Sequence, residues 1–137
     1  MKYLAMIMID PNSEDARDYA EGKPTDPKFA EAMGKHVADL TARGVLLETA
    51  GLLPPAMGTR VRAAEGRLTV TDGPFIESKE IIGGYAMLRT NSKEEAVELG
   101  KEFMNLHLEI LGPSYEGVLE IRQMFDPADG CGGSAKN

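Results

Sequence analysis

The sequence predicts an α+β fold, in which an antiparallel sheet carries two helices on one face and a β-hairpin is inserted. Three observations favour it. Short apolar runs bounded by proline, glycine or aspartate alternate with two longer segments of helical periodicity. These elements follow the order strand, helix, strand, hairpin, strand, helix, strand. Two strand–helix–strand halves of this kind are typical of a ferredoxin-like sheet.

The first half of the chain opens with an apolar strand at Tyr3–Ile9. Both faces of this strand are apolar, so both must be covered, one by the helices of the domain and the other, most simply, by a second subunit. Asp10–Thr25 is polar and predicts a long loop with a helical turn near Glu14–Ala20. The first long helix begins at Asp26-Pro27, an N-cap followed by proline, and closes at Arg43-Gly44.

The rest of the chain supplies the other strands and the second long helix. A strand at Val45–Leu53 precedes a hairpin whose arms are Thr59–Ala63 and Arg67–Thr71. The second helix begins at the capping box Ser92–Glu95 and carries apolar residues at helical spacing. The last two strands flank this helix, at Ile82–Thr90 and Val118–Phe125.

The size and charge of the chain limit its function. Its 137 residues make one domain, residues 1–127, and a small polar tail, residues 128–137, that is expected to be flexible. The formal net charge of −7 argues against a nucleic-acid partner. No run approaches the roughly 18 apolar residues of a membrane span. The N-terminus lacks the features of a signal peptide and a single cysteine fits a reducing compartment, so we expect a cytoplasmic protein.

The stretch Thr71–Glu80 concentrates the chemistry of the chain. Gly73-Pro74 predicts a sharp turn at the end of a strand, since proline fixes its own φ and disfavours helical geometry before it. Asp72, just before the turn, either accepts hydrogen bonds from free N–H groups of the turn or directs its carboxylate into a cleft as a general base. Phe75 is expected to pack as a core plug.

Two charged residues that follow the turn are candidates for ligand contacts. Glu77 and Lys79 are two positions apart, so an extended backbone places them on one face, where their charges can pair. They either contribute to a substrate site or form a solvated surface pair of little energetic weight.

The two histidines lie on the predicted long helices. His36 is at the edge of the apolar stripe of the first helix, and it is either a boundary residue or an acid–base group near Asp72. His107 falls near the end of the second helix, where the helix dipole favours a cation. Their separation is not a metal-ligand spacing, and no phosphate-binding or dinucleotide-binding glycine motif occurs. The sequence therefore predicts neither a metal nor a cofactor.

The segment TDGPFIESKEIIGGYAML, residues 71–88, resembles the signature of the DGPF family, the YCII-related proteins. The match includes the DGPF tetrapeptide, Lys79-Glu80 and Gly84, which occupy the positions expected from that signature. The resemblance extends over most of the chain, including the N-terminal strand, Glu21-Gly22 and the helix that ends near Gly44. It implies a ferredoxin-like fold that is paired into a dimeric α/β barrel.

The resemblance also bears on function. Most members of this family have no established activity, and some are encoded beside, or fused to, extracytoplasmic-function sigma factors. The wider superfamily includes a dehydrochlorinase of chlorinated hydroquinones, and its better-studied members carry a His–Asp pair in a cleft. Asp72 matches the family aspartate, whereas His36 falls on no matched motif.

Two functional hypotheses follow. In the first, the protein binds a small molecule or is a cofactor-independent acid–base enzyme. The residues assigned to this site are Asp72 and His36 for catalysis, and Glu77, Lys79, Tyr19 and Glu21 for substrate binding, the last two from a lid. In the second, the protein is a non-catalytic dimeric regulatory or binding module associated with such a sigma factor.

Both hypotheses include a homodimer through the open face of the sheet. The apolar residues of that face are expected to be Met6 and Met8, or Leu4 and Ile7. A third hypothesis, an oxygenase that binds haem or quinone, is disfavoured because the sequence shows no axial-ligand pattern.

Overall fold

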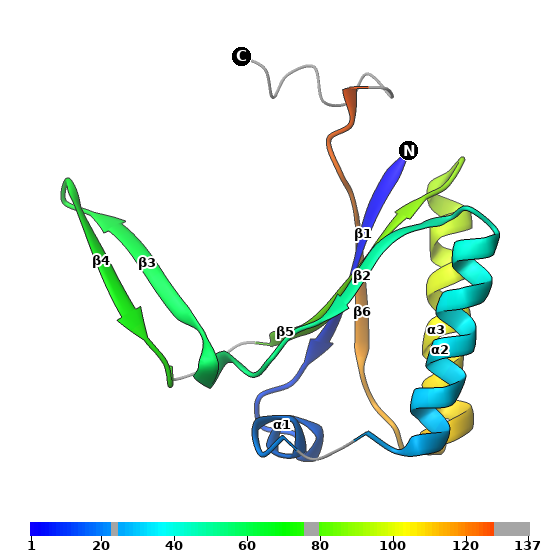
Figure 1. Cartoon of the computed structure of the whole chain (residues 1–137), viewed down its shortest axis with the longest axis horizontal. Helices are drawn as coiled ribbons and strands as arrows, with labels where there is room; N and C mark the ends of the chain where they lie inside the picture. The colour runs from blue at the N-terminus through cyan, green and yellow to red at the C-terminus, as the bar shows by residue number, and fades with distance from the viewer. Residues whose placement is uncertain (23–24, 76–79, 128–137) are drawn as a thin grey trace.

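The computed structural model describes residues 1–22, 25–75 and 80–127. Its elements in chain order are β1 (Lys2–Ile9), α1 (Glu14–Ala20), α2 (Pro27–Ala42), β2 (Leu46–Gly51), the 3-10 turn η1 (Pro55–Met57), β3 (Thr59–Ala64), β4 (Arg67–Asp72), β5 (Ile81–Arg89), α3 (Lys93–Leu111) and β6 (Val118–Gln123). Four strands form an antiparallel sheet in the order β2-β5-β1-β6. Helices α2 and α3 cover one face of this sheet (Figure 1).

This architecture confirms the predicted α+β, ferredoxin-like fold with two helices on one face. The hairpin is not part of the main sheet. Its strands β3 and β4 form a separate two-stranded sheet that projects away from α2 and α3 (Figure 1). Pro54 and Pro55 follow β2 and donate no backbone hydrogen bond, so the chain leaves the sheet there. Within the described ranges, no helix is long and apolar enough to cross a membrane.

The long helices begin where their capping residues predicted. The Asp26 carboxylate accepts a 2.8 Å hydrogen bond from the Lys28 amide, and Pro27 occupies the first helical position. The Ser92 hydroxyl accepts a 3.1 Å bond from the Glu95 amide at the start of α3. These contacts satisfy N–H groups that the first turn of a helix leaves free.

The strand β1 is central, because it pairs with both β5 and β6. Its residues Tyr3 and Ala5 face the helices and form the main hydrophobic core with other buried residues: Leu40, Leu88, Ala96 and Leu99. Met6 and Met8 lie on the opposite face with Leu4, since successive strand residues alternate. The alternative expectation, that Leu4 and Ile7 share the open face, was wrong. The two positions are three apart, so their side chains lie on opposite faces, and Ile7 faces the helices.

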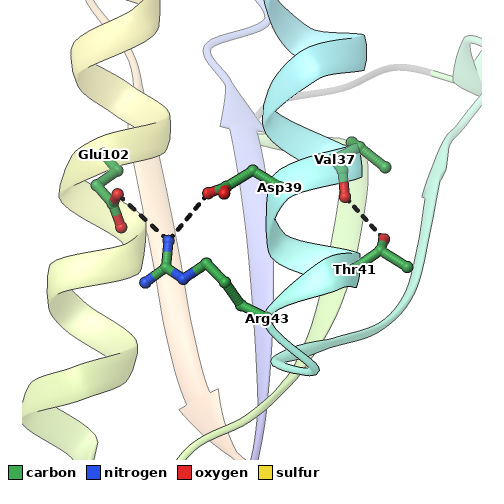
Figure 2. Close-up of polar contacts among 5 residues, drawn as sticks. All are labelled: Val37, Asp39, Thr41, Arg43 and Glu102. Carbon is green, nitrogen blue, oxygen red and sulfur yellow. Dashed lines mark hydrogen bonds and ion pairs between the residues drawn. The ribbon is translucent and has the colours of Figure 1, made fainter.

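An arginine joins the two long helices at the surface, as Figure 2 shows. Arg43 Nη1 lies 3.1 Å from Asp39 Oδ2 on α2 and 3.6 Å from Glu102 Oε1 on α3. The hydrogen bond that Arg43 donates to Asp39, with the nearby Glu102 charge, raises the pKa of the Arg43 guanidinium. One turn away, the Thr41 hydroxyl donates a 2.7 Å bond to the Val37 carbonyl. The two long helices are therefore linked by charge at the surface, in addition to the aromatic contacts between them.

The β3–β4 hairpin has one apolar and one basic face. Val61 is opposite Val70, and Ala63 is opposite Leu68, so these four side chains share a face. Val61, Leu68 and Val70 are 66%, 74% and 66% exposed. The other face carries the arginines and threonines between them: Arg60, Arg62, Arg67, Thr69 and Thr71.

Candidate functional site

A cavity of about 380 Å³ lies between the helices and the sheet, and it is partly open to solvent. Half of the strand residues that line it are glycine or alanine: Ala5, Ala50, Gly51, Gly83, Gly84 and Ala86. Small side chains leave a gap that larger ones would fill in a close-packed interior. Gly84 has a second reason to be glycine, because a Cβ there would lie 3.0 Å from the Ala50 carbonyl oxygen.

Aromatic rings from both helices form the wall of the cavity. Phe29 and His36 come from α2, and Phe103 and His107 from α3, where a spacing of four residues places both on one face. The rings of Phe29 and Phe103 each lie 4.7 Å from His107 in edge-to-face geometry. Aromatic pairs prefer such arrangements at this separation. A continuous aromatic surface therefore spans the gap between the helices.

His107 lies at the centre of this aromatic cluster. Its side chain is 7% exposed, its Nδ1 lies 3.0 Å from the Phe103 carbonyl oxygen, and its ring lies 4.8 Å from that of Tyr115. The sequence assigned it to the helix dipole. Its burial among rings, before the end of α3 at Leu111, gives it a packing role instead.

His36 differs from His107 in its hydrogen bonding. Its ring lines the cavity and lies 6.3 Å from the ring of Phe103. Its Nε2 is buried and has no hydrogen-bond partner among the residues that the structure describes. An unsatisfied buried polar atom costs about 1–3 kcal/mol of desolvation. A partner for this nitrogen is therefore expected from outside the described residues.

The described lining of the cavity is mostly apolar. None of its lining residues, in the part of the chain that the structure describes, is aspartate, glutamate, lysine or arginine. Its Thr49 hydroxyl already donates a 2.8 Å bond to the Tyr85 carbonyl. Across residues 1–22, 25–75 and 80–127, no group of three or more metal-ligating side chains is present.

Asp72 lies outside this cavity lining. It is exposed at the end of β4, and its Oδ1 accepts a 2.7 Å hydrogen bond from the hydroxyl of Thr59, its partner across the hairpin. The predicted Asp72–His36 pair is thus not assembled in this cavity. The reason is topological, because Asp72 belongs to the separate hairpin sheet and His36 to a helix on the main sheet.

The remaining predicted site residues are also placed apart. Glu77 and Lys79 lie outside the described residues. Tyr19 is half-buried on α1, where its hydroxyl donates to the Leu52 carbonyl and burial raises its pKa. Glu21 is exposed at the end of that helix. Neither Tyr19 nor Glu21 is among the residues that line the cavity.

Phe75 is a correction to the predicted core plug. It is half-buried and absent from the main core, and the Arg60 guanidinium carbon lies 3.8 Å from its ring centroid. This separation is typical of a cation–π contact. Phe75 therefore packs against Arg60 at the base of the hairpin.

The sequence did not point to the aromatic wall as a site. Phe29 and Met33 recur at helical spacing in the first long helix, and Phe103 and His107 in the second, and each pattern is typical of an apolar stripe. The available signal was two helices that each carry a histidine next to phenylalanines at helical spacing, with glycines at the start of β5. That signal is also common in ordinary cores.

Comparisons with known proteins give relatives for most of the chain. The family described as YCII-related domain matches residues 1–106, which include most of the cavity lining. An uncharacterised protein of Rhizobium meliloti (strain 1021) is 28% identical over 111 residues, covering 81% of this chain and 76% of that protein.

Proposed function

This chain belongs to the YCII-related family, and we propose that it binds a small molecule in the cavity between α2, α3 and the sheet. The observation that carries this proposal is the cavity itself. Its volume of about 380 Å³ falls within the range of roughly 300–1,000 Å³ typical of ligand sites. Such sites are mostly apolar with a few placed polar groups, as in this lining.

The energetics of packing support a ligand site over a loosely packed core. An empty apolar cavity costs roughly 24 cal/mol per Å³, so a space of this size would cost on the order of several kcal/mol if it were closed. A larger side chain at Ala86, which shares the helix-facing side of β5 with Leu88, would reduce that cost. A chain that keeps small residues there gains from the space only when something occupies it.

The lining favours binding over acid–base catalysis by the predicted pair. Asp72 is engaged by Thr59 outside the cavity, and no carboxylate lines the cavity among the described residues. In a cofactor-independent reaction, His36 is the wall group that would exchange a proton with a ligand, because its Nε2 has no partner there.

The proposal includes a homodimer through the open face of the sheet. Leu4 and Met8 are half-buried on that face beside Met6, which the protomer itself already buries, and Val118 at the sheet edge is 52% exposed. The apolar face of the hairpin adds further uncovered surface, which is unusual for a monomeric protein. A second copy of the chain would cover both the open sheet face and the hairpin face.

The single cysteine fits a reducing compartment, and we assign the dimer to the cytoplasm.

The test is a fragment titration followed by amide chemical shifts, using neutral aromatic fragments and aromatic carboxylates as two separate sets. We expect neutral fragments to shift the signals of Phe29, His36 and Phe103. Ala86→Leu, which fills the floor of the cavity, should abolish these shifts. Ala38→Leu, at an exposed position of α2, should leave them unchanged and is the matched control.

Absence of any binder would contradict the proposal. It would favour the alternative of a non-catalytic dimeric module associated with a sigma factor, in which the fold serves protein contacts only.

A further inference from the structure

The walls of the cavity select for flat rings. His107 joins Phe29, Phe103 and Tyr115 through centroid separations of 4.7, 4.7 and 4.8 Å. Aromatic faces and edges attract a further ring beyond simple area burial, by about 0.5–1.5 kcal/mol for each pair. A planar ligand therefore has an advantage over an aliphatic one of equal size.

The same walls select against ionised ligands. Placing a charged group in an apolar site without a counter-charge is strongly unfavourable. Because no aspartate, glutamate, lysine or arginine lines this cavity within the described residues, an ammonium ligand finds no counter-charge there. A carboxylate would depend on the ring nitrogen of His36 alone.

His36 is a lining residue whose buried ring nitrogen has no partner among the described residues. Nδ1 of His107 lies at hydrogen-bond distance from a carbonyl, whereas Nε2 of His36 is buried with no partner among the described residues. A ring nitrogen of histidine donates or accepts according to its tautomer. A hydroxyl group fits both cases, since it also donates and accepts. A small side-chain adjustment of His36, of the kind common on binding, presents the nitrogen to such a group.

We infer that the ligand of this cavity is a neutral aromatic molecule with a hydroxyl group, and that Nε2 of His36 hydrogen-bonds that hydroxyl. The inference rests on the proposed function, because it names the chemical class of the ligand for the same cavity. His36 is the residue that determines specificity, and the rings of Phe29, Phe103 and His107 provide affinity.

The experiment compares 2-naphthol with naphthalene and 2-naphthoate by direct titration of probe fluorescence. The chain contains no tryptophan, so the protein contributes little emission of its own. We expect 2-naphthol to bind about three- to tenfold more tightly than naphthalene, the range of one net hydrogen bond. 2-Naphthoate should bind more weakly than naphthalene. In His36→Leu, the preference for 2-naphthol should disappear while naphthalene binding is retained.

The outcomes separate the inference from the proposed function. If naphthalene and 2-naphthol bind equally to the wild type, or if the preference survives in His36→Leu, the inference is overturned and the cavity remains a ligand site. The inference is also overturned if 2-naphthoate binds most tightly. If no probe binds, or if Ala86→Leu binds all three as the wild type does, the cavity is not the site and both proposals are overturned.

Discussion

The hydroxyl of Thr59 donates a 2.7 Å hydrogen bond to Oδ1 of Asp72, and the two residues are direct partners across the β3–β4 hairpin. Asp72 thus lies at the base of the hairpin and bonds its two strands to each other. It accepts from a side chain of the opposite strand, whereas the two interpretations of the sequence assigned it either an N–H group of the following turn or a place in a cleft. This contact gives Asp72 a structural role that can be measured without knowing a ligand.

Thr59→Val and Asp72→Ala should show coupled effects on stability. Each is expected to lower the free energy of unfolding by about 0.5–1 kcal/mol, because both residues are exposed and a single hydrogen bond has a small net effect. The double variant should lose less than the sum of the two. Urea denaturation of the four proteins measures this, and Thr69→Val, on the other face, is the control. Additive losses would show that the bond does not stabilise the hairpin.

Gly73→Ala and Gly34→Ala should change stability in opposite directions. A Cβ at Gly73 would lie 2.6 Å from the Ala56 carbonyl oxygen and 2.8 Å from that of Pro55, so backbone must move, at a cost of about 1–3 kcal/mol. Gly34 lies inside α2 with no atom within 4 Å of an added Cβ, and alanine there should stabilise by about 0.5–1 kcal/mol. Thermal and urea unfolding of both variants test the pair. An unchanged midpoint for Gly73→Ala would contradict the close approach.

His36→Leu should stabilise the ligand-free protein. The substitution removes a buried nitrogen that has no partner in the described chain and leaves an apolar group of similar size, so a gain of about 1 kcal/mol is expected. Val37→Ala, on the same turn of α2, is the comparison and should destabilise through lost apolar contact. Denaturation without ligand measures both. A loss of stability in His36→Leu would show that Nε2 is satisfied in the folded protein.

The fold was predictable because its signals are local. Asp26-Pro27 and Ser92–Glu95 mark helix starts through contacts within a few residues, and the strands show continuous apolar runs. The position of the hairpin depends on which strand it pairs with, and no local pattern contains that information. The cavity could not be predicted for the same reason, since it is the space left where Ala86 and Gly84 of the sheet face the aromatic wall of the helices.

The relation between Asp72 and His36 illustrates the limit more sharply. Each residue stood out for its chemistry, yet whether they share a site depends on the arrangement of two separate sheets. His36 lines the cavity, whereas Asp72 lies at the base of the hairpin. Residue type and spacing therefore suggested candidate groups, and only the topology determined which of them belong together.

Alkaline pH should destabilise the protein partly through Tyr19. Burial raises the pKa of this phenol above its ordinary value of 10.0, so the unfolded chain ionises first as the pH rises. Below about pH 10 the phenol is neutral in both states and the contribution to stability is fully present; it is lost as the pH rises through the folded-state pKa. Tyr19→Phe should make the decline of stability with alkaline pH shallower. Identical slopes in both proteins would show that Tyr19 ionises equally in the folded and unfolded states.

Leu68→Lys should weaken the proposed dimer, while Thr69→Lys should not. The two residues are neighbours on β4 and point to opposite faces of the hairpin, so both variants add the same charge to the same strand. Leu68 is 74% exposed in the protomer, and a lysine there changes an apolar face that a second copy would cover.

Sedimentation velocity at micromolar concentration distinguishes the two variants. A dimeric wild type, a dimeric Thr69→Lys and a monomeric Leu68→Lys are expected. A dimer that survives Leu68→Lys would restrict the interface to the open face of the four-stranded sheet. A monomeric wild type would contradict the proposed dimer as a whole, because the apolar face of the hairpin would then be exposed to solvent in the free protein.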